Sequence, residues 1–256
     1  MLLTGATGGL GGAAARALAA RGAQVVLTGR RSEPLEALAA ELGGRAIAGD
    51  LSDPGAPERL VADAGEVDVL VANAALPASG VLDSFTPAEI DRALAVNLRA
   101  PIVLARLLAP DMAARGRGHL VFVSSLAGRS AGPHSSLYSA TKFGLRGFAL
   151  GLRQDLAEHG VGVSCVLPGF VRGAGMFADS GASLPPGVGT STPEQVAAGI
   201  VRAIERNRGE IDVAPLGLKA GARIGAIAPG LSASVQSRLG SFKVARAIGA
   251  GQRDKR

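Results

Sequence analysis

The sequence predicts an α/β protein: a doubly wound parallel sheet of about seven strands with helices on both faces. Two observations carry this prediction. Short apolar runs alternate with helix-patterned segments through most of the chain, and such alternation is typical of βαβ units in a parallel sheet. Aromatic residues make up only 3% of the 256 residues, while Ala, Gly, Val and Leu dominate. This composition favours closely packed helices on a sheet over an all-β sandwich.

Strands are expected where apolar residues cluster between turn residues. In chain order they are Met1–Thr4, Gln24–Thr28, Arg45–Ala48, Val67–Ala72, His119–Ser124, Val161–Leu167 and Glu210–Val213. Helices are expected between them, over residues 9–21, 33–42, 54–64, 86–110, 136–159 and 193–208. Thr86 and Thr192 each stand before a proline, as a capping residue does before Pro at the first helical position. Leu145, Phe148 and Leu152 recur at spacings of three and four, which gives residues 136–159 an apolar face.

Charge divides the chain into two parts. Residues 1–210 hold 19 basic and 19 acidic side chains, whereas residues 211–256 hold eight basic and two acidic ones, which produces the net charge of +6. We therefore interpret residues 1–213 as one folded domain and residues 214–256 as a basic, helical C-terminal extension. A nucleic-acid surface would need the positive charge on the domain, with aromatic stacking groups between the basic residues. We expect no nucleic-acid partner.

The extension contains a short apolar stripe made of Leu231, Val235, Leu239 and Phe242. This stripe predicts a helix and leaves its partner open, because it could dock on the domain, dock on a second subunit, or lie on a membrane surface. Docking is the interpretation that we favour, since arginines interrupt the stripe. Peripheral membrane contact through the extension is the alternative.

Other residues exclude several classes of protein. No run of about 18 apolar residues predicts a membrane-spanning helix, and the chain does not begin as a signal peptide would. The single cysteine, Cys165, lies in an apolar segment and is interpreted as a small buried hydrophobe. His119, His134 and His159 lack metal-ligand spacing, so they are expected at the surface or at strand ends, and no metal is predicted. These features favour a cytoplasmic protein.

One pair of side chains stands out. Tyr138 is the only tyrosine, and Lys142 is the only lysine in the first 218 residues. On a helix, residues four apart share a face, so the phenol and the ammonium are expected to lie together. At about 4 Å and an effective dielectric constant of about 20 their attraction would be roughly 4 kcal/mol, enough to lower a phenol pKa of about 10 by up to roughly three units. The two residues are candidates for an acid–base pair.

A glycine-rich segment follows the first expected strand. Residues 4–12 read Thr-Gly-Ala-Thr-Gly-Gly-Leu-Gly-Gly, where glycines let the backbone approach a pyrophosphate and the helix N-terminus supplies free N–H groups. At the end of the second strand, Arg30 and Arg31 stand where an acidic residue would bind the ribose hydroxyls of NAD. Arginine there accommodates a 2′-phosphate. A Rossmann-like site that prefers NADP(H) over NAD(H) is therefore predicted.

With these residues in place, the chain resembles the short-chain dehydrogenase/reductases, in particular their single-domain branch. The resemblance covers roughly residues 1–210. Ser125 lies 13 residues before Tyr138, a spacing that this family uses. The other matching motifs are Thr-Gly-x3-Gly-x-Gly at 4–11, Asp50-Leu51, Asn73-Ala74-Ala75, Asn97, Tyr138-x3-Lys142 and Pro168-Gly169.

By this resemblance, four residues would be catalytic. Tyr138 would be the general acid that protonates the substrate oxygen, and Ser125 would hydrogen-bond the same oxygen. Lys142 would bind the nicotinamide ribose and lower the Tyr138 pKa, while Asn97 would hold a water that links Lys142 to solvent. The resemblance assigns cofactor binding to Gly5, Thr7, Gly8, Gly9, Leu10, Gly11, Arg30, Arg31, Asp50, Leu51, Asn73, Ala74, Ala75, Tyr138, Lys142, Pro168, Gly169 and Val171.

The sequence also departs from the family pattern. Ala75 stands where the family usually has glycine, and Gly173 stands where it often has a threonine that bonds the nicotinamide carboxamide. The first strand is short before Thr4, so we expect that the native start lies upstream or that the segment has been shortened. Residues 170–191, which are rich in Gly, Ser and Pro, correspond to the family's mobile substrate lid. Their few apolar side chains favour a hydrophobic carbonyl substrate.

The expected activity is that of an NADPH-dependent carbonyl reductase, or alcohol dehydrogenase in the reverse direction, on a small-molecule substrate. By the resemblance, the protein would be a homodimer or homotetramer that pairs the helices near 86–110 and 136–159. The alternative is a cofactor-binding protein without turnover that acts as an interaction or regulatory module. The intact set of Ser125, Tyr138 and Lys142 argues against that alternative, whereas Gly173 and the extension favour it.

Overall fold

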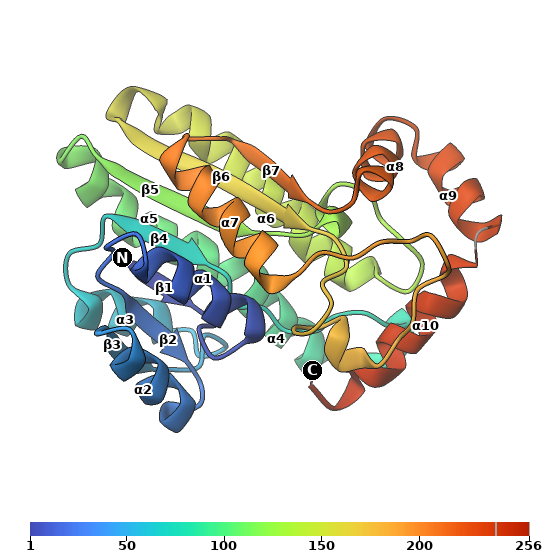
Figure 1. Ribbon diagram of the computed structural model, residues 1–256, viewed down its shortest axis with the longest axis horizontal. Helices are drawn as coiled ribbons and strands as arrows, with labels where there is room; N and C mark the ends of the chain where they lie inside the picture. Colours follow the sequence, from blue (N-terminus) through green and yellow to red (C-terminus); the bar gives the residue numbers. More distant parts are fainter. Residues whose placement is uncertain (239, 256) are drawn as a thin grey trace.

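Seven parallel strands form one sheet in the computed structural model, which describes residues 1–238 and 240–255 (Figure 1). The strand order is β3-β2-β1-β4-β5-β6-β7. Because the order runs outward from β1 in both directions, the sheet is doubly wound, as predicted. The strands are β1 (Leu2–Thr4), β2 (Val26–Gly29), β3 (Arg45–Ala48), β4 (Val69–Ala72), β5 (Gly118–Val123), β6 (Val161–Pro168) and β7 (Glu210–Val213).

Helices cover both faces of the sheet, so this part of the prediction is confirmed. Three helices pack on one face: α1 (Gly9–Ala19), α2 (Ser32–Glu41) and α7 (Pro193–Glu205). Three others pack on the opposite face: α3 (Ala56–Ala64), α5 (Ala100–Ala114) and α6 (Ser136–Asp155).

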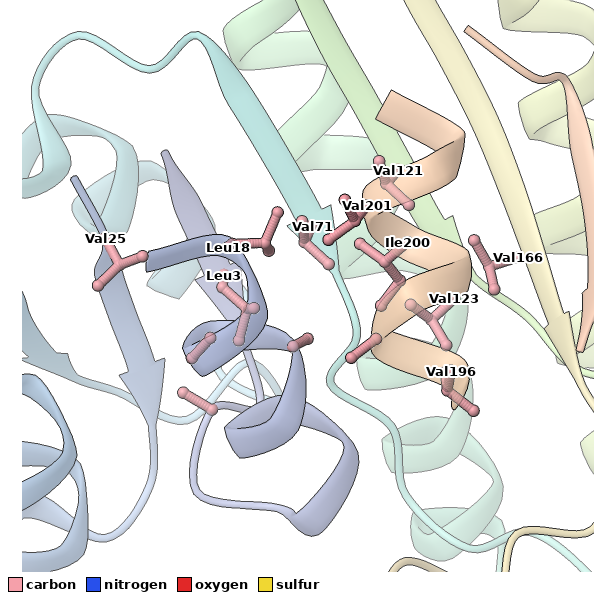
Figure 2. Packing of buried hydrophobic residues seen from close by; sticks show 14 of the residues in the cluster. Leu3, Leu18, Val25, Val71, Val121, Val123, Val166, Val196, Ile200 and Val201 are labelled. Carbon is pink, nitrogen blue, oxygen red and sulfur yellow. The ribbon is translucent and has the colours of Figure 1, made fainter. Parts of the chain in front are cut away.

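Alternating side chains of the strands supply the two cores. Leu3 belongs to the first core and Leu2 to the second, and neither is exposed. Figure 2 shows the first core, where Val121 of β5 lies near Ile200 of α7, and Leu18 of α1 packs over the sheet. Strands buried on both faces are continuous apolar runs, which is why the sequence locates them well.

The helix expected at 136–159 is shorter than predicted. Regular helix ends at Asp155, and a 3₁₀ turn at Ala157–His159 follows. The C-cap of the regular helix is Leu156, and Gly160, with the left-handed conformation φ 68°, ψ 14°, ends the 3₁₀ turn. Leu156 already has φ −99°, ψ 0°.

The helix expected at 86–110 is longer than predicted and is not regular. It consists of α4 (Pro87–Leu94), a π turn at Ala95–Arg99 and α5, which reaches Ala114. By length and hydropathy alone this helix could cross a membrane, but half of its most apolar window is buried, 50%. Leu104 and Met112 of that helix lie in the second core. It therefore serves as a core helix of the sheet.

Two strand residues that the sequence analysis discussed, Cys165 and His119, are both buried in the structure. Cys165 is buried in β6 and burial raises its thiol pKa to about 12, which confirms the interpretation as a small hydrophobe. His119 lies at the start of β5, which agrees with the expected strand-end position, and it is buried, only 6% exposed. Its Nε2 pairs with Ser164 Oγ at 2.8 Å.

The C-terminal extension is helical, as predicted. It contains α8 (Leu216–Ile227), α9 (Pro229–Arg238), α10 (Ser241–Gly251) and the turn η6 (Arg253–Lys255). The chain folds back so that α10 lies beside the 170–191 segment (Figure 1). Leu239, part of the predicted apolar stripe, and Arg256 lie outside the described residues, as does the side chain of Arg238.

Candidate active site

The glycine-rich turn after β1 is built by close backbone contacts. Gly5 has φ +69°, and a Cβ placed on it would lie 2.8 Å from the Ala74 Cα. A Cβ on Gly11 would lie 2.1 Å from the Gly5 carbonyl oxygen. Thr4 Oγ1 accepts hydrogen bonds from the backbone N–H groups of Asn73 and Ala74, both at 3.0 Å. The turn is therefore held against the end of β4, at the point where the strand order reverses.

This turn fits a pyrophosphate. Gly8 caps α1 without a side-chain hydrogen bond, so the N–H groups of the first turn, at Gly9 and Leu10, have no helical acceptor. Those donors and the positive end of the helix dipole suit a doubly charged anion. A Cβ on Gly9 would lie 2.1 Å from the Ala174 Cβ, which shows that the 170–191 segment passes directly over the turn.

Two arginines and one carboxylate lie where the adenosine end of a dinucleotide would bind. Arg30 and Arg31 are exposed at the end of β2, and Arg31 Nη2 donates to the Thr7 carbonyl at 3.0 Å. Asp50 Oδ1 accepts from the Ser52 backbone N–H at 2.9 Å. Burial raises the Asp50 pKa, but the bonds with Ser52 and the charge of Arg30 outweigh it, so the pKa is lowered overall. Leu51 beside it packs on the second core.

Ser125, Tyr138 and Lys142 converge just beyond β5. Ser125 Oγ accepts from the Ala127 N–H at 3.1 Å and caps a 3₁₀ turn. It donates to the Pro168 carbonyl at 3.4 Å and lies close enough to the Tyr138 phenol to lower its pKa. Lys142 lies one turn after Tyr138 on α6, with its Nζ 5.8 Å from the centre of the phenol ring. The structure therefore brings together three of the four residues expected to be catalytic.

The pKa of Tyr138 differs from the sequence prediction. Burial raises the Tyr138 pKa, and the Ser125 hydroxyl lowers it only in part. Lys142 Nζ points to the Val123 carbonyl, to which it donates at 3.0 Å, and burial lowers the lysine pKa to about 8. The Tyr138 pKa is thus raised and not lowered as predicted, because loss of water around the phenol is the largest cause of its shift.

Asn97 lies inside the π turn and is fully buried. Its Oδ1 accepts from the Leu76 N–H at 2.6 Å and its Nδ2 donates to the Leu76 carbonyl at 3.0 Å. The amide therefore joins the helix to the loop after β4. Pro101 lacks the N–H that the Asn97 carbonyl would accept four residues later, and π turns of this kind recur at functional sites.

The end of β6 completes the edge of the sheet. Gly169 N–H donates to the Val213 carbonyl at 3.0 Å, and Val171 is buried and pairs with Ser191. This pairing closes the 170–191 segment into a loop. Gly173 has φ +81°, a conformation that disfavours the threonine common in the family.

All the expected cofactor residues lie along the carboxyl edges of β1, β2, β3, β4, β5 and β6, or on the helices that begin there. Sequence reasoning missed two contributors. One is Thr4 Oγ1, whose position directly before the first glycine is the only sequence feature that pointed to it. The other is the Val123 carbonyl, which binds Lys142 and which no sequence feature could identify, because it is a backbone group.

Comparison with known proteins agrees with this geometry. The profile of the short chain dehydrogenase family matches residues 1–184. Ketoacyl reductase HetN of Nostoc sp. is 39% identical over 222 residues, which cover 83% of this chain and 77% of that protein. A short-chain dehydrogenase from Sphingobium yanoikuyae in complex with NADPH superposes with a TM-score of 0.78 at 28% identity, over 90% of this chain and 94% of the other. A metagenomic short-chain oxidoreductase in complex with NADP superposes with a TM-score of 0.66 at 36% identity, over 83% of this chain and 94% of the other.

The chain belongs to the short-chain dehydrogenase/reductase family. It is accordingly an NAD(P)-dependent oxidoreductase that acts on CH–OH or C=O groups.

Proposed function

We propose that this protein is an NADPH-dependent carbonyl reductase, with alcohol oxidation as the reverse reaction. The observation that carries the proposal is the convergence of the Ser125 hydroxyl, the Tyr138 phenol and the Lys142 ammonium at the carboxyl edge of β5. A carbonyl oxygen that becomes an alkoxide needs a hydrogen-bond donor and a proton. This site supplies both on adjacent side chains.

Tyr138 acts as the proton donor in this scheme. Because its pKa is raised, the phenol stays protonated across the neutral range, and this favours reduction. A nicotinamide cofactor held at the glycine-rich turn and by Lys142 would supply the hydride for the carbonyl carbon. Ser125 donates a hydrogen bond to the carbonyl oxygen and holds it in line with the phenol. The phenol proton then passes to that oxygen.

Lys142 and Asn97 resupply the proton. The Lys142 ammonium lies beneath the phenol ring and would bind the hydroxyls of the nicotinamide ribose. Both polar atoms of the Asn97 amide are engaged by Leu76. A water that links Lys142 to solvent would therefore bind the Asn97 main-chain carbonyl, for which Pro101 provides no helical N–H.

The preference for NADP(H) rests on Arg30 and Arg31. Both guanidinium groups are exposed at the end of β2, where a 2′-phosphate would receive charge-assisted hydrogen bonds. An Arg30→Ala, Arg31→Ala double variant should lose most of its preference, measured as the ratio of kcat/KM for NADPH to that for NADH. Arg208→Ala, an exposed arginine before β7, is the control and should leave the ratio unchanged.

The substrate is proposed to be a hydrophobic ketone. Phe170 and Phe177 of the 170–191 segment contact each other at 5.0 Å between ring centres, and Met176 directly precedes Phe177 in the sequence. The names of similar proteins point the same way: one is a ketoacyl reductase and another is a bulky-bulky ketone specific alcohol dehydrogenase from Comamonas testosteroni. We further propose a cytoplasmic homodimer or homotetramer.

The test follows NADPH absorbance against a panel of ketones of increasing size. We expect consumption of NADPH with at least one ketone and a fall in kcat of about 10²- to 10⁴-fold in Tyr138→Phe, with NADPH affinity retained. Binding of NADPH without consumption across the panel would favour the cofactor-binding module instead. Ser136→Ala, an exposed residue at the start of α6, controls for a general disturbance of the helix.

A further inference from the structure

The outward faces of α8 and α9 carry large apolar side chains. We name the set formed by Leu216, Ile224, Ile227, Leu231 and Val235 the outer ridge. Its members are 84%, 51%, 87%, 60% and 46% exposed, respectively. On α8 the spacing places three of them on one face. Elsewhere among the described residues, the only other large apolar side chains so exposed are Val81, Leu82, Phe143 and Phe242.

The inner faces of the same helices are mostly small or polar, with Leu218 of α8, which reaches Gly169, as a large apolar exception. A Cβ on Gly225 of α8 would lie 2.1 Å from Ser130 Oγ, so only glycine allows this approach. On α9, Gln236 Nε2 donates to the Ala131 carbonyl at 3.3 Å. A surface helix normally turns its apolar face toward the core. Here most of the large apolar side chains face outward instead, and an exposed apolar patch of this kind marks an interaction surface.

An ion pair fixes the orientation of the ridge. Arg223 of α8 pairs with Asp212 at 3.1 Å, and the Asp212 side chain is only 4% exposed. Turning the ridge inward would break this pair and leave a buried carboxylate with less compensation. In Figure 1, α8 and α9 project from the end of the molecule beyond β7, so a flat surface could approach them.

Charge decides which partner suits the ridge. Residues 214–253 contain no Asp or Glu and six basic residues, of which Arg223 is paired with Asp212; the other five are Lys219, Arg238, Lys243, Arg246 and Arg253. In a two-fold interface the same surface meets itself, so a second copy would place positive charge against positive charge. An anionic bilayer offers the opposite charge together with an apolar interior.

We propose that the outer ridge binds the surface of an anionic lipid bilayer. The apolar side chains of α8 and α9 enter the boundary between headgroups and acyl chains, and basic side chains such as Lys243 of α10 contact the lipid headgroups. This role is independent of the reductase reaction, because it involves neither the glycine-rich turn nor Tyr138.

Co-sedimentation of the full chain with vesicles tests the proposal. Vesicles of phosphatidylcholine mixed with phosphatidylserine should bind the protein, and vesicles of phosphatidylcholine alone should bind it much less. The Ile227→Ser, Leu231→Ser double variant should weaken binding to the mixed vesicles about tenfold or more, since apolar burial is lost without a change of charge. Lys243→Gln should weaken it about fivefold, and added salt should reduce this difference.

The matched control is Ala233→Ser. Ala233 is exposed on α9, but it lies two residues from both Leu231 and Val235 and therefore on another side of the helix. It should bind as the wild type does. Absence of binding to the mixed vesicles, or equal effects of the control and the double variant, would overturn the proposal. So would a change of molar mass in the double variant without lipid, because the ridge would then be an interface between copies.

Discussion

The glycine-rich turn at residues 4–12 and the helices α8 and α9 are both rich in small residues, yet they use them differently. In the turn, Gly11 lets one backbone segment contact another, and the large side chains nearby, such as Leu3 and Leu18, point into the core. In α8, Gly225 brings a helix onto the domain while Ile224 and Ile227 point outward. Similar composition therefore serves a binding turn in one region and an inverted surface helix in the other.

The largest expected effect tests whether glycine is required in the turn. Gly11→Ala places a Cβ 2.1 Å from the Gly5 carbonyl oxygen, and a backbone atom cannot move away cheaply. We expect the free energy of unfolding to fall by about 3 kcal/mol, with loss of NADPH binding. Urea denaturation and a cofactor titration measure the two effects.

The neighbouring glycine provides the matched control. A Cβ on Gly12 would meet the flexible end of Arg16 at 3.3 Å and the Ala6 carbonyl oxygen at an ordinary contact distance of 3.6 Å, so Gly12→Ala should stabilise the helix by about 0.5–1 kcal/mol. Gly221→Ala on α8, where no atom lies within 4 Å, should do the same. Equal losses at Gly11 and Gly12 would show that the turn does not depend on close backbone contact.

Acid should reveal a titrating group in the sheet that the extension lacks. Burial, and secondarily the charge of Arg153, lower the His119 pKa to about 4. Between about pH 6.5 and pH 4 the unfolded chain binds a proton on this imidazole, whereas the folded chain does not. The free energy of unfolding therefore decreases as the pH is lowered through this range, by up to about 3 kcal/mol. In His119→Gln the fall should be shallower. Residues 214–253 contain no Asp, Glu or His and add nothing to this slope.

Denaturant midpoints at a series of pH values measure the difference between the two proteins. The remaining carboxylates titrate alike in both and cancel. Parallel pH curves for the wild type and His119→Gln would show that burial of this imidazole has no energetic cost.

Much of the sheet and its edge could be predicted from the sequence, because the determining features are local. Strands buried on both faces are apolar runs, and the glycines of the turn are fixed by their position after β1. The π turn around Asn97 could not be predicted, since it changes the helix by one residue without altering the apolar pattern; Pro101 is the only sequence feature near it. The direction in which the Lys142 side chain points could not be predicted either. Spacing places it on the face of Tyr138, but the target of its Nζ is a backbone carbonyl.

A smaller effect, on NADPH affinity, follows from the pKa of Lys142 and tests whether this side chain is buried as described. Burial lowers it to about 8, so above this pH the amine loses its proton and its attraction for ribose hydroxyls weakens. NADPH affinity should fall as pH rises past that value, by up to about tenfold per pH unit. Fluorescence titration of NADPH measures it. Lys142→Arg stays charged, and its affinity should not change over the same range; an identical decline would assign the effect to another group.

The smallest effect concerns the contact between the extension and the 170–191 segment. Gln252 Nε2 donates to the Met176 carbonyl at 2.9 Å, and its side chain is buried. A Cβ on Gly251 would lie 2.0 Å from the Ser180 carbonyl oxygen, so α10 lies directly against this segment. If the segment is the substrate lid, Gln252→Ala should raise KM for the ketone about fivefold through loss of one hydrogen bond, while NADPH affinity stays the same.

Gln236→Ala is the control for this change. It removes a similar hydrogen bond, from α9 to the Ala131 carbonyl, without touching the 170–191 segment. A rise in KM for Gln252→Ala alone would mean that α10 helps to position the substrate, whereas α9 only supports the outer ridge. The extension would then divide into a part that serves the active site and a part that faces a partner. Equal KM values in both variants would contradict this division, because the contact with Met176 would have no part in substrate binding.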